Sequence, residues 1–217
     1  MCRFLLRSSS QPHDPRDEVV HFARMCQHSH CLDGDWQGDG WGVAWWQDGT
    51  GWQRYRSVAP IWTEMEALPD LPPTRHLVVH ARAASFPQHK GKLVYSQPYV
   101  WESYAFVFNG LIKGVRLPRK VPGSIGAAKI WHLVQEQLQR GAPLQTALQH
   151  VYTTLEEHSS VIQACNMGLS DGQTFAFYNG NPSGNDYYQL HQVHDGSLRM
   201  VCSEPFGTWQ WQTAEKA

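Results

Sequence analysis

The sequence predicts an α+β fold with two mainly antiparallel sheets and helices packed on their outer faces. Three observations support this fold class. Strand-like segments fill both ends of the chain, two neighbouring helical segments lie between them, and strands and helices do not alternate. Regular alternation would instead favour a doubly wound parallel sheet. For a chain of 217 residues we expect one domain, spanning residues 2–217.

The first third of the chain predicts three strands and one helix. Residues 3–8 form an apolar run that is typical of a short buried strand, and apolar residues recur at helical spacing over 17–28. A glycine-rich turn begins at Gly38 and leads into a strand that ends at Trp46. The turn at 47–51 then predicts a hairpin to a strand at 52–58.

The rest of the chain predicts two helices between strands. Strands at 76–80 and 104–109 flank an irregular stretch of about two dozen residues, a length that is unusual unless the loop is functional. Two helices follow at 124–140 and 143–158. Residues 161–211 alternate between apolar and polar positions and predict four or five strands separated by turns.

Charge and composition exclude several classes of protein. The formal net charge is −1 and the basic residues are scattered, which disfavours a nucleic-acid partner. No apolar run approaches the ~20 residues of a membrane span, and the first residues lack the apolar segment of a signal peptide. We therefore expect a cytoplasmic protein without a membrane partner. Its five cysteines, an odd number, should then be reduced thiols.

Cys2 is a candidate nucleophile. Its small side chain permits removal of Met1, which would leave a cysteine with a free α-amine. Because an α-amine has a pKa of roughly 7.7–8.0, it is partly neutral at pH 7 and can accept the proton of the thiol. The alternative is that position 2 simply holds a small residue.

Two further segments follow predicted strands. Arg82 lies among small residues in His80–Ser85, where its planar guanidinium could bind a carboxylate, although a structural ion pair explains it equally well. Asn109 and Gly110 end the strand at 104–109. A side-chain amide and a backbone N–H could there converge on one oxyanion, the alternative being an ordinary Asn-Gly turn.

Metal and cofactor sites find little support. Cys26, His28, His30 and Cys31 are potential ligands, but their spacing is not that of a structural zinc site. A surface histidine cluster is the preferred interpretation. The glycines of 38–42 have the wrong spacing for a dinucleotide site, and a strand rather than a helix follows them. We expect no metal and no cofactor.

Six segments together resemble the class II glutamine amidotransferases, in the order found in that family. They are Cys2, Gly38–Gly42, His80–Ser85, Phe108–Gly110, Ser170–Gly172 and Ser203–Pro205. The resemblance runs from Cys2 to Pro205, nearly the whole chain. It is greatest to the stand-alone members, including the γ-glutamyl hydrolases of ergothioneine biosynthesis and of glutathione-related degradation.

The resemblance implies a fold and a set of roles. The fold would be the four-layer αββα sandwich of N-terminal nucleophile hydrolases. Cys2 would be the nucleophile, Arg82 would hold the substrate α-carboxylate with Ser85 in support, and Asn109 with Gly110 would form the oxyanion hole. Three acidic residues of the shared segments would have structural or supporting roles: Asp39, Asp171 and Glu204.

The sequence also departs from the family pattern. Phe108 replaces the histidine of the usual His-Asn-Gly, and Ser96–Tyr99 replaces Asn-His-Pro-Phe. At the entry of the helix at 124–140, Gly126 stands where the family has the aspartate that holds the substrate amine. The predicted pocket is therefore altered at its α-amine end and intact at its reacting end.

The resemblance implies an enzyme that acts on a small γ-glutamyl molecule. The preferred hypothesis is hydrolysis of a γ-glutamyl amide, glutamine or a larger compound, through a γ-glutamyl thioester on Cys2. One alternative is a glutaminase subunit that supplies ammonia to a protein partner. Another is a catalytically silent binding domain of the same fold.

Overall fold

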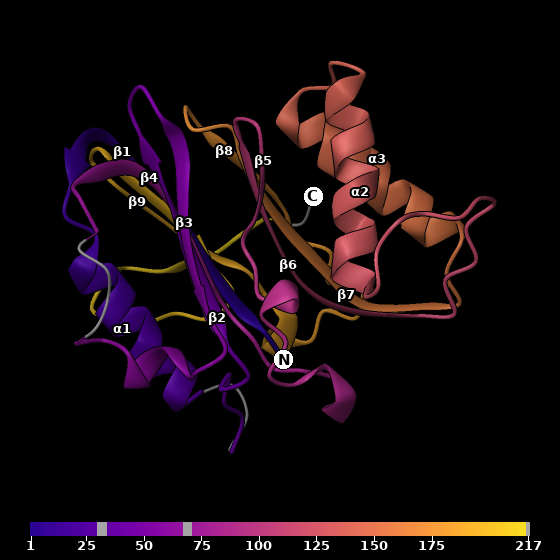
Figure 1. Ribbon diagram of the computed structural model, residues 1–217, viewed down its shortest axis with the longest axis horizontal. Coiled ribbons are helices and arrows are strands. Elements are labelled where there is room, and N and C mark those ends of the chain that lie inside the picture. Colours follow the sequence, from indigo (N-terminus) through magenta and orange to yellow (C-terminus); the bar gives the residue numbers. More distant parts are fainter. Residues whose placement is uncertain (30–33, 67–70, 216–217) are drawn as a thin grey trace.

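The computed structural model describes residues 1–29, 34–66 and 71–215, which form two sheets face to face between helices (Figure 1). Helix α1 (Arg16–Gln27) covers the outer face of one sheet. Helices α2 (Gly126–Gln139) and α3 (Leu144–Glu157) cover the outer face of the other. The predicted four-layer αββα sandwich is thus confirmed.

The larger sheet has seven strands in the described part of the chain, in the order β11-β9-β10-β1-β4-β2-β3. Every pairing in it is antiparallel. Its strands are β1 (Arg3–His13), β2 (Trp41–Gln47), β3 (Gly51–Ser57), β4 (Thr74–Ala81), β9 (His191–Asp195), β10 (Leu198–Cys202) and β11 (Gln212–Thr213). Strand β1 therefore lies in the middle, between β10 and β4.

The smaller sheet comprises four strands among the described residues, in the order β5-β6-β7-β8. Its pairings are also antiparallel. Its strands are β5 (Tyr99–Trp101), β6 (Tyr104–Lys113), β7 (Val161–Ser170) and β8 (Phe175–Tyr178). Short 3-10 helices lie in the connections: η1 (Ile61–Thr63), η2 (Pro87–His89), η3 (Leu93–Tyr95) and η4 (Asp186–Tyr188).

Three elements differ from the sequence prediction. Strand β6 does not end at Asn109 and Gly110 but continues to Lys113, because these residues go on pairing with β7. Strand β1 continues past Ser8 to His13, because its polar second half pairs with other strands and reaches Thr74 at its end. Strand β5 was not predicted, since its three residues carry no pattern of their own and are ordered by pairing with β6. The irregular stretch between 80 and 104 otherwise contains only the 3-10 helices η2 and η3.

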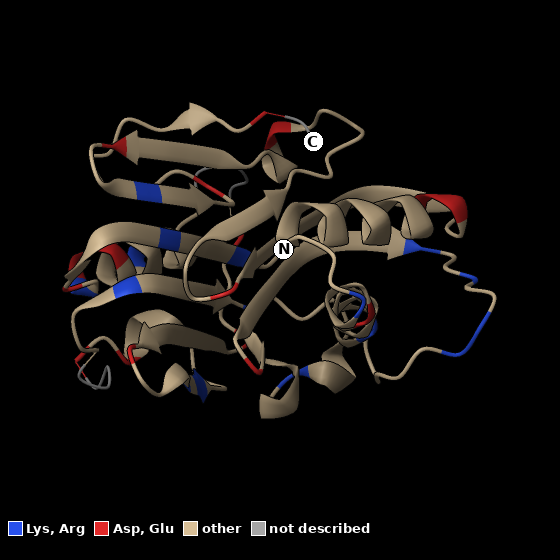
Figure 2. Ribbon diagram, turned by 90° about the horizontal axis from the view of Figure 1, so that it is seen from above, with Lys and Arg blue, Asp and Glu red and all other residues tan. Residues whose placement is uncertain are grey.

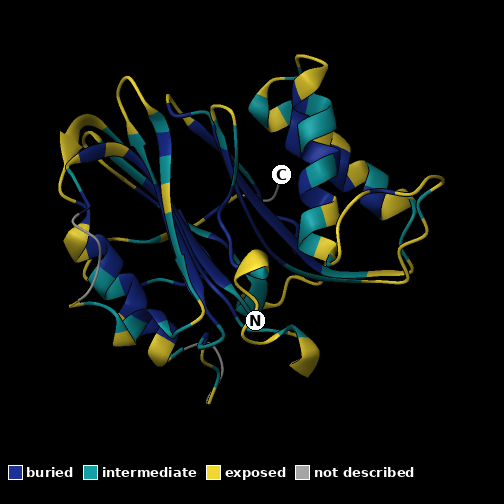
Figure 3. Ribbon diagram, in the orientation of Figure 1, coloured by how far each residue is buried: buried dark blue, intermediate teal, exposed yellow. Residues whose placement is uncertain are grey.

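Alternation along the strands separates three apolar layers. Leu5 packs toward α1, whereas its neighbours Phe4 and Leu6 face the smaller sheet. Phe106 likewise packs against α2 and α3, while Val107 faces the larger sheet. Figure 3 shows the burial that results, with the central strands and the inner faces of the helices dark.

Charged side chains are spread over the molecule. Figure 2 shows Lys, Arg, Asp and Glu on many elements, with several basic positions in succession along the loop that follows β6. In the described part of the chain, no helix has the length and apolar character needed to cross a membrane.

Candidate active site

Cys2 and Arg82 lie next to each other at one end of the larger sheet. Cys2 immediately precedes β1 and Arg82 immediately follows β4, and the two strands pair with Arg3 opposite Ala81. By the alternation that turns Phe4 toward the smaller sheet, Cys2 belongs to the inner face of the sandwich. The strand register therefore brings together two residues that the sequence separates widely.

The thiol of Cys2 contacts the main chain that follows Arg82. The Ala83 N–H donates to Sγ at 3.4 Å, and Sγ lies 3.6 Å from the Ala83 carbonyl oxygen. Burial raises the pKa of the Cys2 thiol, and the Ala83 N–H, the terminal ammonium, Arg82 and Arg3 act in the opposite direction. Burial outweighs these groups, so the pKa of the thiol is raised and the positive charges offset only part of the cost of forming the thiolate.

Asp39 and the loop after β4 hold Arg82 in place. Arg82 is only 5% exposed, its Nη1 donates to the Asp39 carbonyl oxygen at 3.3 Å, and its guanidinium lies 5.6 Å from the Tyr95 ring centre. The Asp39 carboxylate accepts the Ala84 N–H at 2.8 Å and pairs with Lys90 at 3.1 Å. Asp39 thus shapes the loop, which is the structural role predicted for it.

Asn109 is a buried polar residue on the inner face of the smaller sheet. It lies two residues beyond Val107, on the same face of β6. It is 1% exposed, and among the described residues neither atom of its side-chain amide has a hydrogen-bond partner. An unpaired buried amide is costly, and a preorganised donor in an active site is one reason to retain it.

The two sheets are aligned so that Asn109 lies at the Cys2 end of the sandwich. Gln97 bonds to Phe108, and a Cβ on Gly42 would come within 2.4 Å of the Gln97 carbonyl oxygen. In the larger sheet, Gly42 of β2 pairs with His80 of β4, and His80 pairs with Phe4 of β1. Asn109 therefore lies at the same end of the interior as Cys2.

His80 lies in this interior without a charge. It is completely buried, and burial, with a smaller contribution from Arg82, lowers the pKa of its imidazole to about 3. His80 is therefore neutral at ordinary pH and adds no positive charge to the site.

Gly110 is required by packing. A Cβ at this position would lie 2.3 Å from the Ala164 carbonyl oxygen and 2.7 Å from the Phe108 ring. Any larger residue would push β6 away from β7. Gly110 therefore allows β6 and β7 to approach each other closely. This packing role is independent of any contribution of its N–H to catalysis.

A network of buried charges fixes the start of β1. Arg3 donates to Glu204 at 2.9 Å and to Ser29 at 3.3 Å, and its Nη2 lies 3.5 Å from Asp35. The Tyr187 ring lies under the guanidinium, 4.6 Å from it. Burial by itself would lower the pKa of Arg3, but these acidic neighbours outweigh it and raise the pKa.

The terminal ammonium is bound by the same network. The Met1 nitrogen lies 3.3 and 3.4 Å from the two Asp35 carboxylate oxygens and also contacts the Tyr187 hydroxyl. Tyr187 donates to Asp35 at 2.6 Å. Asp35 and Tyr187 thus form an ammonium-binding pair one residue from the nucleophile.

Sequence reasoning missed four residues of this region: Asp35, Gln97, Asn166 and Tyr187. Asn166 is directly opposite Asn109 across the β6–β7 pair, and its Nδ2 donates to the Tyr188 carbonyl oxygen at 2.6 Å. No local pattern marks Asp35, Asn166 or Tyr187. Only Gln97 carried a signal, as the residue that replaces the family histidine before Pro98.

Other predicted positions lie apart from this interior. Ser85 is exposed at the beginning of the loop after β4. Asp171 accepts the N–H groups of Gln173 and Thr174 at 2.9 and 2.8 Å and so caps a turn, which agrees with a structural role.

The two candidate metal ligands that lie in the described part of the chain, Cys26 and His28, do not share one site. Cys26 is buried in the apolar layer under α1, whereas His28 is exposed. His30 and Cys31 lie outside the described residues. Within the described residues, no group of three or more metal-ligating side chains is found.

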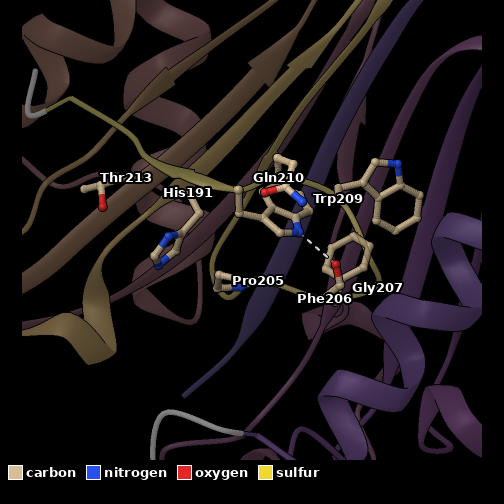
Figure 4. Close-up of a pocket in the computed structure, with 8 residues that line it drawn as sticks. His191, Pro205, Phe206, Gly207, Trp209, Gln210 and Thr213 are labelled. Carbon is tan, nitrogen blue, oxygen red and sulfur yellow. Dashed lines mark hydrogen bonds between the residues drawn. The ribbon is translucent and has the colours of Figure 1, made fainter.

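Two surface hollows lie outside the predicted site. One, of about 630 Å³, lies beside the C-terminal turn, and Figure 4 draws the residues that line it. There the Trp211 ring N–H donates to the Phe206 carbonyl oxygen at 2.7 Å. None of the predicted catalytic residues lines it, although Pro205 of the Ser-Glu-Pro segment does. The other, of about 440 Å³, includes Ser29 and Asp35 and so adjoins the terminal network.

Comparison with solved structures identifies the fold as that of class II glutamine amidotransferase domains. The sequence matches no protein-family profile and no curated protein. The glutamine aminotransferase class-II domain protein from Silicibacter pomeroyi has a TM-score of 0.66 at 16% identity, covering 99% of this chain and 92% of its own. A protein described as a predicted glutamine amidotransferase from Pseudomonas aeruginosa has a TM-score of 0.52 at 13% identity, covering 97% and 93%.

A longer enzyme shares the same fold over part of its length. Glutamine phosphoribosylpyrophosphate amidotransferase from B. subtilis has a TM-score of 0.57 at 14% identity. The match covers 94% of this chain but only 42% of that enzyme. At such identities the likeness shows the fold alone, and the fold agrees with the one that the sequence motifs imply.

Proposed function

We propose that this protein is an N-terminal-cysteine amidohydrolase that cleaves a γ-glutamyl amide, within a single domain spanning residues 2–217. The observation that carries the proposal is that residues from three strands or their immediate flanks, β1, β4 and β6, lie at the same end of the interior. Cys2 contacts the main chain next to Arg82, and the unpartnered amide of Asn109 lies at the same end of the interior. Nucleophile, carboxylate-binding cation and oxyanion donor are the minimum set for this chemistry.

In the proposed mechanism, removal of Met1 exposes the α-amine of Cys2, which takes the proton of the thiol. The thiolate attacks the δ-carbonyl carbon, a carbon–sulfur bond forms, and Asn109 and Gly110 stabilise the oxyanion. The C–N bond then breaks and the amine or ammonia leaves with the proton. Water attacks the γ-glutamyl thioester, releasing glutamate and restoring the thiol.

The substrate is proposed to be held chiefly through its carboxylate. Arg82 supplies the positive charge, with Ser85 as a supporting contact at the loop. Helix α2 has no acidic residue in its first turn, and Gly126 is exposed there. Since an unpaired ammonium is costly to bury, a γ-glutamyl compound with a modified α-amine, or one held by another group, fits better than free glutamine.

The test is a panel of γ-glutamyl amides with free and with modified α-amines, together with glutamine, with the released glutamate or N-modified glutamate measured for each. Turnover of a larger γ-glutamyl amide whose α-amine is modified or held by another group, in preference to glutamine, is the expected result. Efficient release of ammonia from glutamine would favour a glutaminase that serves a protein partner. Cleavage of no γ-glutamyl amide would overturn the proposal and leave a silent binding domain.

A further inference from the structure

Gln97 lies at the position where β5, if it were longer, would form its next residue pair with β6. Strand β5 pairs with β6 from Trp101 opposite Tyr104 to Tyr99 opposite Phe106. The same register places Gln97 opposite Phe108, yet β5 ends at Tyr99. The N–H and C=O of Phe108 on this edge therefore have no strand beside them.

The main chain around Gln97 is turned toward the larger sheet. Arg56 donates to the Ser96 carbonyl oxygen at 3.1 Å, and Arg54 donates to the Pro98 carbonyl oxygen at 3.3 Å. The carbonyl oxygen of Gln97 itself occupies the space beside Gly42, where a Cβ would approach to 2.4 Å. The backbone of Gln97 thus packs on the sheet that carries Cys2.

The side chain of Gln97 takes the place of the missing strand. Its Oε1 accepts the Phe108 N–H at 2.7 Å, and its Nε2 donates to the Phe108 carbonyl oxygen at 3.3 Å. A carboxamide offers the same donor and acceptor as a peptide group, so one side chain satisfies both main-chain groups. Gln97 is 3% exposed, so water does not compete for these bonds.

Phe108 directly precedes the oxyanion residue. Fixing its N–H and C=O fixes the peptide plane that leads into Asn109, and with it the direction of the Asn109 side chain and the Gly110 N–H. We propose that Gln97 is a positioning residue, which sets Asn109 and Gly110 relative to Cys2 by joining β6 to the larger sheet. This inference rests on the proposed function.

The first test compares wild type with two variants. Gln97→Met keeps the length of the side chain and removes both bonds, and Gln97→Asn keeps the amide but shortens its reach. In both we expect kcat on the best γ-glutamyl substrate to fall about 10²-fold, the effect of a small misplacement in a catalytic group, with KM little changed. Gln189→Met is the matched control, because the Gln189 amide also bonds to main-chain oxygens, those of Leu190 and Ala214.

Alkylation of Cys2 by iodoacetamide separates positioning of the oxyanion hole from damage to the nucleophile. That displacement forms no oxyanion, so its rate should be the same in wild type and both Gln97 variants. A matching loss of kcat and of alkylation rate would overturn the inference, as would an unchanged kcat.

A second measurement does not depend on turnover. Amide hydrogen exchange should be faster at Phe108, Asn109 and Gly110 in either Gln97 variant, while the β9–β10 hairpin keeps its protection. If wild type cleaves no γ-glutamyl amide, the proposed function fails, and exchange alone decides the positioning role. Unchanged exchange at these three residues in both variants would then overturn it.

Discussion

Arg3 and Glu204 form a buried ion pair, with Nε and the carboxylate oxygen 2.9 Å apart and side chains 0% and 1% exposed. The pair links the first residue of β1 to the Ser-Glu-Pro segment near the other end of the chain. Ser29 also donates to Glu204, at 2.7 Å. The position of the nucleophile therefore depends on a contact between residues about two hundred positions apart in the sequence.

Glu204→Gln should destabilise the fold by about 3 kcal/mol, because it removes the nearer of the two carboxylates that pair with the buried Arg3 in the described part of the chain. Chemical denaturation monitored by tryptophan fluorescence measures the change. Asp195→Asn, at the exposed end of β9, is the control and should lie within about 0.5 kcal/mol of wild type. Equal stability of Glu204→Gln and wild type would show that the pair contributes nothing net.

Cys2→Ala should abolish turnover and leave the fold intact, because the sulfur makes only the Ala83 contact in the described structure. Released glutamate measures activity, and intact mass should show loss of Met1 and a γ-glutamyl adduct in trapped wild type. Cys26→Ala, which removes a buried thiol from the layer under α1, is the control and should retain turnover. Wild-type activity in Cys2→Ala would exclude the mechanism.

The pH dependence of Cys2 alkylation should show that burial raises the pKa of the Cys2 thiol. Burial raises the thiol pKa, so in protein that retains Met1 the thiolate forms only at higher pH than in the unfolded chain. Alkylation by iodoacetamide, mapped to the Cys2 peptide, should therefore have a higher midpoint in the folded state. Processed protein should react faster at pH 7, because its own α-amine accepts the proton. Identical rates with and without Met1 would argue against the α-amine as base.

Arg82→Ala should lower kcat/KM for γ-glutamyl substrates by roughly 10- to 100-fold, since a charge-assisted bidentate bond contributes ~1.5–3 kcal/mol. Arg82→Lys should recover only part of this loss, because an ammonium cannot form the planar pair. Arg75→Ala, on an exposed position of β4, is the matched control. A thermal melt of each variant distinguishes loss of binding from loss of structure. If kcat/KM of Arg82→Ala equals that of wild type, Arg82 does not contact the substrate.

Gly126→Asp should raise turnover of free glutamine by supplying a carboxylate for its ammonium. A Cβ at Gly126 meets no atom within 4 Å, so the substitution fits, and an acid at the first residue of α2 is favoured by the helix dipole. Gly126→Asn has the same shape without the charge and should leave glutamine turnover low. Efficient glutaminase activity in the wild type would contradict the reasoning behind this variant.

Much of the fold could be predicted because its signals are local. The helix predicted at 17–28 is α1, Arg16–Gln27, and the two later helices end within two residues of their predicted bounds. The strands with apolar alternation were also found. The failures are β5, the second half of β1 and the end of β6 beyond Asn109. In each segment the pairing partner, and not its own composition, makes it a strand.

The candidate site could be predicted where a motif names its residues. Cys2, Arg82 and Asn109 stand in recognisable segments, and the structure brings them to one end of the sandwich. Asp35 and Tyr187 stand in no such segment. Asp35 and Tyr187 come together because two distant segments of the chain fold back beside the first residue of β1. No sequence pattern around either residue predicts this contact.

The sequence by itself determined the order of strands and helices, the alternation that gives each strand an inner and an outer face, and the chemical groups at each strand end. Tertiary structure alone decided which of those groups meet. Strand register places Cys2 beside Arg82, and sheet packing places Gln97 between Gly42 and Phe108. The physical reason is that local propensity acts over a few residues, whereas a buried polar contact depends on the alignment of whole strands and sheets.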